Sequence, residues 1–360
     1  MNSKKPTIKK YIFTSIILTS IIIFSNGNKV CGNLNIYPQK IGQFNTTFAW
    51  DVVVIDHIAY IGSNEEGLQI INVSDPRNPI ELGHINLGVT HSIDVLKGVA
   101  YLANYFNGLQ IVNVSNPLNP VKISDFYDGG HIFDVFANED LVYLVSAERG
   151  LEIINCNDIR NPIKIGEYND GGSPNGVFIK DDLAFIAEYH AGLEIINISD
   201  PCNPFEIGEY FIGEGAYSVN VLENLAYVCY STYGLEIIDV SDPFQPIALG
   251  SFDNGGNVHF AFISDDLAFV SDDVDGFELV NVSDPTNPWK ISGFNDGGHT
   301  RNLFVNNNLV FLADLDDGLE ILELSDVPPS KYPIFIILTI AIIILTSVIL
   351  VIIIVYRHKK

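Results

Sequence analysis

Short apolar runs recur along this chain at a fixed spacing. The clearest, residues 234–240 (GLEIIDV), is mostly apolar and β-branched, which is typical of a strand covered on both faces. It is followed by Ser241-Asp242-Pro243, where Asp favours a turn and Pro cannot continue a ladder. The other copies begin at Gly67, Gly108, Gly150, Gly192, Gly276 and Gly318, at intervals of 41 or 42 residues. This period predicts stacked supersecondary units.

Each period is expected to contain four strands. In the second period they are predicted at residues 91–96, 99–103, 108–114 and 121–127, with turn or loop residues between them. Four short strands per period are typical of the blades of a β-propeller.

A count of strand types predicts how the ring closes. The second and third strands occur seven times each, whereas the fourth occurs only six times after the turns. Residues 37–45 match the pattern of residues 161–169, a fourth strand with its turn, and precede the first complete set. The N-terminal strand is therefore predicted to complete the last blade in a 3+1 arrangement. The expected fold class is an all-β, seven-bladed propeller of four-stranded blades over residues 37–326, because closure protects the strand edges.

The repeat resembles the LVIVD-repeat family. The residues that carry the resemblance are GLEIIDVSDP from Gly234, paired with LAYV at residues 225–228, and it extends over roughly residues 37–326. The third copy departs from the pattern with Asn157-Asp158-Ile159, and the seventh lacks the turn. The resemblance implies a β-propeller at a prokaryotic cell surface, and it supplies no catalytic residues.

Both ends of the chain have features of membrane targeting. Residues 1–27 combine four lysines with an apolar run, as in a signal peptide or N-terminal anchor. Residues 334–356 are uncharged and long enough for a transmembrane helix, and the tail 357–360 is basic, which predicts a cytoplasmic C-terminus. Linkers are expected at 28–36 and 327–333. The propeller is thus predicted to be extracytoplasmic on a single-pass membrane protein.

The charge distribution excludes one class of partner. All 44 acidic residues lie between Asp51 and Asp326, whereas ten of the 19 basic residues lie outside that segment. A surface this acidic repels nucleic acid, and no nucleic-acid partner is therefore expected. The four cysteines have no metal-binding or redox spacing; a bridge between Cys156 and Cys202 is conceivable.

Ligand-binding candidates lie in the loops between the second and third strands, where the copies differ most. Loops on a rigid scaffold commonly carry function, and these loops mix aromatic and charged residues that suit sugars, peptides or cations. The candidates are Tyr105, Phe106, Arg149, Tyr189, His190, Tyr230 and Tyr233, together with Arg301 near the start of a first strand.

Three histidines are candidate metal ligands. His91, His131 and His299 are aligned at one position of the first strand, each followed three residues later by Asp94, Asp134 or Asn302. Three imidazoles near one another suit a divalent ion. The alternative is that each His caps its own strand and bonds its own Asp or Asn.

Two acidic loops are weaker candidates for Ca²⁺. They contain Asp273 and Asp275, and Asp314 and Asp316, without EF-hand spacing. No organic cofactor is predicted, and Ca²⁺ or another divalent ion is the alternative. Asparagine glycosylation signals occur at Asn45, Asn72, Asn113, Asn197 and Asn281.

The chain lacks the nucleophile, phosphate-binding and zinc-protease motifs of common enzymes. The predicted function is therefore non-catalytic binding of a surface protein or glycan by a membrane-anchored propeller. The alternatives are a polysaccharide hydrolase or lyase with its site at the channel mouth, and a structural component of a surface layer.

Overall fold

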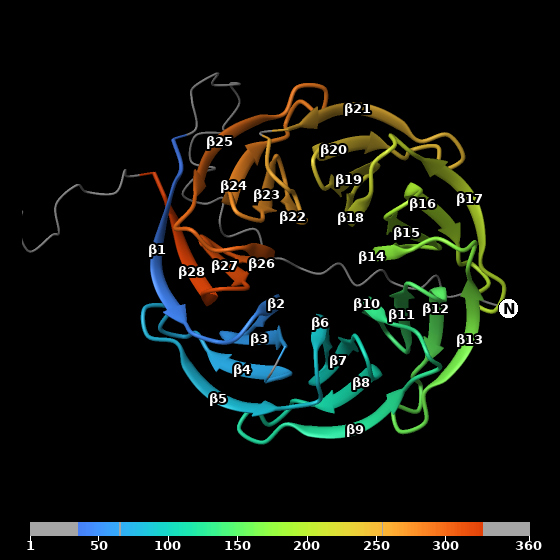
Figure 1. The fold of residues 1–360 in the computed structure, drawn as a ribbon, viewed down its shortest axis with the longest axis horizontal. Coiled ribbons are helices and arrows are strands. Elements are labelled where there is room, and N and C mark those ends of the chain that lie inside the picture. Colours follow the sequence, from blue (N-terminus) through green and yellow to red (C-terminus); the bar gives the residue numbers. More distant parts are fainter. Residues whose placement is uncertain (1–34, 65, 254, 327–360) are drawn as a thin grey trace, which may run out of the picture.

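The computed structural model describes residues 35–64, 66–253 and 255–326. They form seven antiparallel sheets of four strands each, arranged in a ring (Figure 1). The predicted all-β, seven-bladed architecture is confirmed. The predicted N-terminal targeting segment and the predicted transmembrane helix at 334–356 lie outside the described residues.

Among those described residues there is no helix of the length and apolarity needed to cross a membrane.

Each blade runs from an innermost first strand to an outermost fourth strand. The first strands are β2 (Ala49–Ile55), β6 (Thr90–Leu96), β10 (Ile132–Asn138), β14 (Pro174–Lys180), β18 (Ala216–Leu222), β22 (Phe260–Ser264) and β26 (Thr300–Asn306). The second strands are β3 (Ile58–Ser63), β7 (Val99–Asn104), β11 (Leu141–Ser146), β15 (Leu183–Glu188), β19 (Leu225–Tyr230), β23 (Leu267–Asp272) and β27 (Leu309–Asp314).

The third strands carry the repeat motif. They are β4 (Leu68–Asn72), β8 (Gly108–Asn113), β12 (Gly150–Asn155), β16 (Gly192–Asn197), β20 (Gly234–Asp239), β24 (Gly276–Asn281) and β28 (Gly318–Ser325). The fourth strands are β5 (Ile80–Ile85), β9 (Val121–Phe126), β13 (Ile163–Tyr168), β17 (Phe205–Tyr210), β21 (Ile247–Phe252) and β25 (Trp289–Phe294), with β1 (Tyr37–Phe44) in the last blade. Blades 1 to 6 begin with β2, β6, β10, β14, β18 and β22, and blade 7 has the order β26-β27-β28-β1.

Blade 7 joins the two ends of the propeller. Strand β1 pairs antiparallel with β28, from Tyr37 opposite Ser325 to Phe44 opposite Leu319. The ammonium of Lys40 on β1 contacts the carboxylate of Glu320 on β28, which is 1% exposed. The sheet that the C-terminal strands begin is thus completed by the N-terminal strand.

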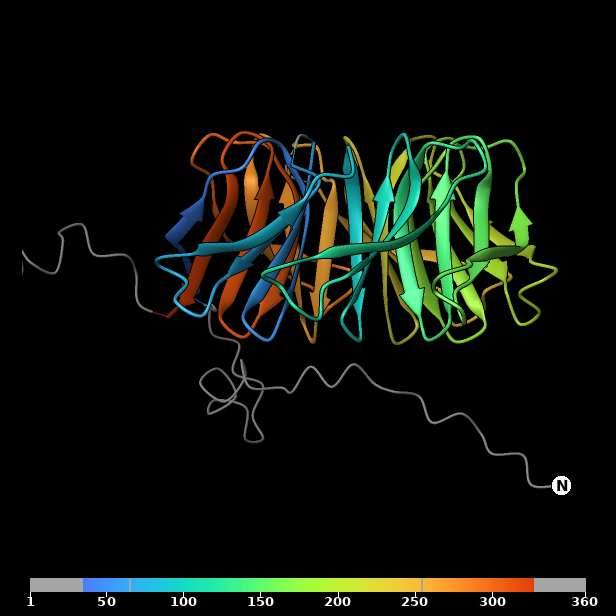
Figure 2. The same cartoon turned by 90° about the horizontal axis from the view of Figure 1, so that it is seen from below.

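The connections divide the disc into two faces (Figure 2). The hairpins between first and second strands and the turns between third and fourth strands share one face, called the turn face here. The loops between second and third strands and the links between blades share the other, the mouth face. Strand β1 begins and β28 ends at the turn face, where Tyr37 and Ser325 are paired. Both ends of the described chain therefore leave on the side opposite the loops.

The hydrophobic core lies between adjacent blades. Between blades 4 and 5, for example, Leu193 and Ile195 pack with Val219 and Val228, and all are buried. The repeat glycine fixes the start of each third strand: Gly150 has φ of 68°, and a Cβ there would lie 2.2 Å from the carbonyl oxygen of Tyr168. Only glycine fits such a close backbone approach without strain.

Carboxylates also link the innermost strands. Asp51 Oδ2 accepts a hydrogen bond from the backbone N–H of Ile93 in the next blade, at 2.7 Å. In the same way Asp134 Oδ2 accepts from Val177 N, at 2.9 Å. Burial raises the pKa of Asp51 to about 7, with a smaller effect from the Asp134 charge.

Candidate binding site at the mouth of the propeller

Seven side chains, one from the start of the first strand of each blade, surround the axis at the mouth face. Each lies 17 residues before the repeat glycine of its blade, and each is partly buried. Since these positions are equivalent in the seven blades, the side chains form a ring, called the mouth ring here. Its members are Trp50, His91, Phe133, Asn175, Tyr217, His259 and Arg301.

Most neighbours in the mouth ring touch. The ring centroids of Trp50 and His91 are 4.6 Å apart, and those of His91 and Phe133 are 5.9 Å apart. On the other side of the axis, Tyr217 and His259 are 4.6 Å apart. Trp50 is held by a hydrogen bond from its Nε1 to Asn64 Oδ1 at 2.8 Å. The ring is therefore a packed layer of aromatic side chains rather than a set of solvated ones.

Arg301 supplies the positive charge of the mouth ring. Its Nη1 donates to His259 Nε2 at 2.5 Å, and its Nη2 lies 3.6 Å from Asp273 Oδ1. Its guanidinium also lies over Trp50. The Nε of Arg301 is buried and has no hydrogen-bond partner within the part of the chain that the structure describes. The Nε–H of Arg301 is thus a hydrogen-bond donor without a described partner, next to an aromatic layer.

The two imidazoles of the mouth ring are neutral at physiological pH. Burial lowers the pKa of His91 to about 4. Burial, followed by the nearby Arg301 charge, lowers the pKa of His259 to about 3. They act as aromatic surface and hydrogen-bonding groups, and the permanent charge of the ring belongs to Arg301.

Loop residues extend the aromatic layer outward. The Tyr105 ring lies 4.8 Å from His91 and 4.7 Å from both Phe106 and His131. Tyr189 approaches Tyr217 of the next blade at 6.2 Å. The predicted loop candidates Tyr105, Phe106 and Tyr189 are therefore brought next to the mouth ring.

The remaining loop candidates divide into exposed and buried residues. Phe106, Tyr189 and Tyr233 are exposed by 58%, 45% and 51%, and Arg149 and His190 are also exposed. Tyr230 is fully buried, so its prediction as a surface ligand-binding residue is wrong. It is the last residue of β19, and its side chain packs in the core between blades 4 and 5.

The predicted alignment of the three histidines is also wrong. His131 and His299 immediately precede β10 and β26, whereas His91 is the second residue of β6 and belongs to the mouth ring. Each histidine is followed three residues later by an acidic or amide residue, but Asp94 and Asp134 do not occupy the same strand position. Asp134 also bonds the next blade rather than a histidine of its own.

The structure does not gather these histidines around one point. His131 Nδ1 pairs with Glu148 Oε1 at 2.5 Å, and His299 Nδ1 pairs with Asp316 Oδ2 at 2.5 Å. The hydrogen bond to Asp316 raises the pKa of His299. Both imidazoles thus have local carboxylate partners, and the predicted three-histidine metal site is not formed.

The acidic residues of the two predicted Ca²⁺ loops have structural partners. Asp314 is 1% exposed, and its Oδ1 accepts from the backbone N–H of Asp316 and Asp317. Asp273 lies beside Arg301. Asp275 precedes β24, and its backbone N–H donates a hydrogen bond to the carbonyl oxygen of Asp272. These contacts order the loops and do not converge on a common centre.

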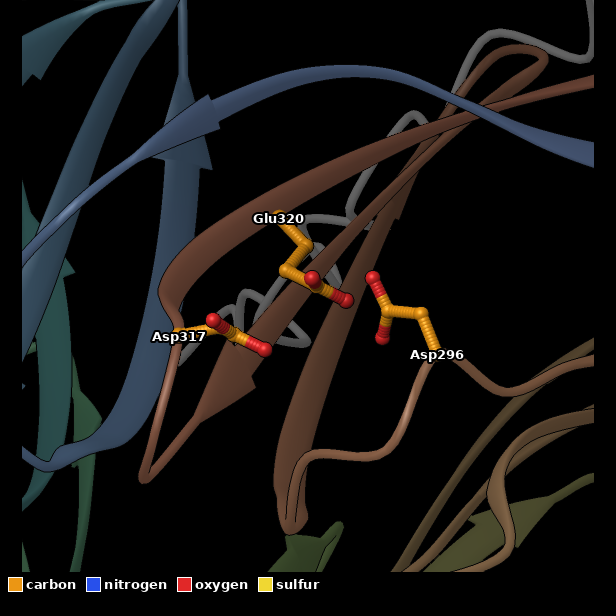
Figure 3. Close-up of side chains that lie close together, drawn as sticks. All are labelled: Asp296, Asp317 and Glu320. Carbon is orange, nitrogen blue, oxygen red and sulfur yellow. The ribbon is translucent and has the colours of Figure 1, made fainter.

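In the described part of the chain, one group of acidic side chains has ligand atoms within 4.8 Å of one another: Asp296, Asp317 and Glu320 in blade 7. Figure 3 shows the three carboxylates pointing toward one another. The ammonium of Lys40 lies among them, 2.7 Å from Asp296 Oδ2 and in contact with Glu320. A lysine therefore already neutralises this group.

The glycosylation candidates fall into two kinds. Asn45 is exposed in the link after β1. The other four end third strands and cap the following turn: Asn113 Oδ1, for example, accepts from Ser115 N at 3.0 Å. Asn113 is exposed but Asn281 is only 8% exposed, so the four sites differ in access.

The described cysteines Cys156, Cys202 and Cys229 form no bridge with one another.

The sequence contains a signal for the mouth ring that lies outside the predicted loops. Trp50, Phe133, Asn175, Tyr217 and His259 share one distance from the repeat glycine, although they differ in chemistry. Alignment on the glycine finds all seven positions, whereas the alignment of like residues placed His91 with His131 and His299, which are not in the ring.

The repeats match a described family. Residues 48–86, 87–127, 171–211, 213–254, 255–296 and 297–332 match the LVIVD repeat, which is more than half of the chain. The chain belongs to the LVIVD-repeat family. The third blade, in which the turn departs from the pattern, is not among the matched segments.

Comparison with other proteins adds only the fold. No curated protein matches the chain. Among solved structures, the crystal structure of the computationally designed Ika8 protein is similar, with a TM-score of 0.59 and 7% identity over 76% of this chain and 83% of that chain. At such low identity, the similarity shows a common fold alone.

Proposed function

We propose that this LVIVD-repeat protein is a non-catalytic binding module that takes a surface protein or glycan at its mouth face. The observation that carries the proposal is the mouth ring, an aromatic layer with Arg301 and its spare Nε donor in it. Aromatic side chains and arginine dominate binding energy at protein interfaces, and flat rings also stack on sugars.

The proposed orientation puts this face away from a membrane. The described chain ends at Asp326, on the turn face, and the predicted transmembrane helix begins eight residues later at 334. So short a connection would bring the turn face toward the bilayer. With the basic tail 357–360 inside the cell, the mouth face would point outward, toward other surface molecules.

The exposed loop aromatics allow a matched test. The propeller, residues 35–326, is applied to a glycan array and used to capture surface proteins, with Phe106→Ala and Tyr189→Ala as test variants. Phe244→Ala is the control, because Phe244 is 66% exposed on the turn face. Loss of a central aromatic anchor is expected to weaken binding about 30-fold, corresponding to about 2 kcal/mol. Equal binding by all three variants would show that the mouth face is not the binding site.

A further inference from the structure

A second feature of the blades lies away from the mouth ring. The third residue of each repeat motif, on the third strand, is a glutamate in five blades. Three of these, Glu152, Glu278 and Glu320, are about 1% or less exposed, and each contacts a lysine ammonium. The lysines are Lys164, Lys290 and Lys40, each the second residue of the outer-strand pattern. Buried carboxylates need such a partner, since desolvated charge is costly.

Blade 4 has the glutamate without the lysine. Glu194 is 4% exposed, and the outer-strand position that holds the lysine in the other three blades is occupied by Glu206, paired with Ile196 in the β16–β17 ladder. No hydrogen-bond donor contacts the Glu194 carboxylate within the described segments; the polar group that contacts it is another carboxyl, that of Asp170. In blade 5, by contrast, Glu236 accepts from the Tyr210 hydroxyl at 3.3 Å.

Glu194 faces a small cavity between blades 3 and 4. The cavity has a volume of about 10 Å³, which is room for one water-sized species. Asp170, Glu188 and Glu194 line it together with the aromatic ring of Tyr168. Glu188 uses its oxygens to accept from the backbone N–H of Ser173, His190 and Ala191, so its charge is fixed in place.

We propose that this cavity binds one divalent cation, with Ca²⁺ the preferred ion, through the carboxylates of Asp170 and Glu194. The ion takes the place that a lysine ammonium fills in blades 3, 6 and 7. Glu188 and Glu206 add negative charge around it, and water completes the coordination. The site is separate from the mouth ring and does not depend on the proposed function.

The chemistry of the cavity favours a hard ion. Ca²⁺ takes six to eight oxygen ligands in flexible arrangements and tolerates water among them. Sites of this kind on extracellular modules bind with dissociation constants of about 0.1–1 mM. The competing occupant is a proton shared by the two carboxyls: burial, followed by the charge of Asp170, raises the pKa of Glu194 to about 8. An ion that binds the carboxylates displaces this proton.

The test uses the full-length protein in detergent, unfolded by heat with Ca²⁺ or with a chelator. Ca²⁺ at about a hundredfold excess over its dissociation constant is expected to raise the unfolding midpoint by roughly 5 °C. Tb³⁺, a luminescent substitute for Ca²⁺, is expected to show emission excited through the neighbouring Tyr168. No shift of the wild-type midpoint by Ca²⁺ would overturn the proposal.

Two variants separate the site from the rest of the acidic surface. Glu206→Lys supplies the ammonium found in the other blades, so the chelated variant is expected to be more stable than wild type and its Ca²⁺ shift is lost. Glu194→Gln also loses the shift and still folds, because Gln69 and Gln110 occupy the equivalent position in blades 1 and 2. Glu81→Lys, the matched change in blade 1, is expected to keep the full shift. An undiminished Ca²⁺ shift in Glu206→Lys or Glu194→Gln would refute the site.

Discussion

The guanidinium carbon of Arg301 lies 5.7 Å from the centroid of the Trp50 ring. These residues belong to the innermost strands of the last and first blades, 251 positions apart in the sequence. The mouth ring therefore closes between blade 7 and blade 1, which are also linked by the chain as it passes from β1, paired with β28 in blade 7, to β2. The Arg301–Trp50 contact, which belongs to the proposed binding surface, therefore also joins the last blade to the first.

We expect Arg301 and Trp50 to stabilise the propeller jointly. A cation over an indole ring contributes about 0.5–2 kcal/mol, depending on its desolvation. Chemical unfolding of Arg301→Ala, Trp50→Ala and the double variant should show a coupling energy of that size. Phe106→Ala combined with Arg301→Ala serves as the control, because no contact between these two side chains is expected. Additive effects of Arg301→Ala and Trp50→Ala would show that the contact contributes nothing.

The architecture could be predicted from the sequence because it depends on a period. The interval between the repeat glycines and the number of copies of each strand type determine the blades, and each strand recurs where its pattern recurs. Residues 37–45 could be assigned to the last blade for the same reason, since a fourth strand was needed there. Local patterns repeated seven times average out errors at single positions.

The site could be predicted only in part, because it depends on contacts between blades. Tyr105 and Phe106 were found from their loop, but their packing on His91 and His131 joins different strands. Tyr230 occupies the strand position held by buried Glu188 and Asp314, and nothing local distinguishes it from a loop tyrosine. Sequence spacing gives the position of a residue along its strand, whereas the burial of its side chain depends on the packing of the neighbouring blade.

The Lys40–Glu320 contact should matter more than surface ion pairs. Glu320 is 1% exposed, so Lys40→Met leaves a buried carboxylate without its cation, and we expect a loss of about 2 kcal/mol in the free energy of unfolding. Lys40→Met combined with Glu320→Gln should recover most of it. Arg77→Ala is the control, because the Arg77–Glu323 pair is exposed and such pairs contribute about 0–1 kcal/mol. Denaturant titration measures all four proteins; equal losses for Lys40→Met and Arg77→Ala would contradict the expectation.

The buried carboxyl groups should make the propeller less stable as the pH rises from about 4 to about 8. Burial raises the pKa of Asp94 to about 6, of Asp51 to about 7 and of Glu194 to about 8. A pKa that is higher in the folded state than in the unfolded state contributes stability that is complete below pH ~4 and lost as the pH rises through the folded value. The chelated protein should therefore unfold at lower denaturant concentration at about pH 8.5 than at about pH 6.5, the lowest pH at which the lowered pKa values of His91 and His259 make little opposing contribution.

Two variants test the assignment of this pH dependence. Glu194→Gln should reduce the decline between these pH values, since it removes one of the titrating groups. Asp75→Asn should not change it: hydrogen bonds from Asn78 and Arg77 lower the pKa of Asp75, so its contribution is lost only as the pH falls below about 4. A decline of the same size in Glu194→Gln as in wild type would assign the effect to other groups.

Tyr230→Phe should stabilise the protein. The Tyr230 side chain is fully buried, and its hydroxyl has no hydrogen-bond partner among the residues that the structure describes. An unsatisfied buried hydroxyl costs about 1–3 kcal/mol, and phenylalanine keeps the packing of the ring against blade 4, so we expect a gain of about 1 kcal/mol in the free energy of unfolding. Tyr210→Phe is the matched control, because its hydroxyl donates to Glu236 Oε1 at 3.3 Å and its loss leaves that carboxylate without a donor. Thermal unfolding distinguishes the two: a lower midpoint for Tyr230→Phe than for wild type would mean that the hydroxyl is hydrogen-bonded in solution, through a water molecule between blades 4 and 5.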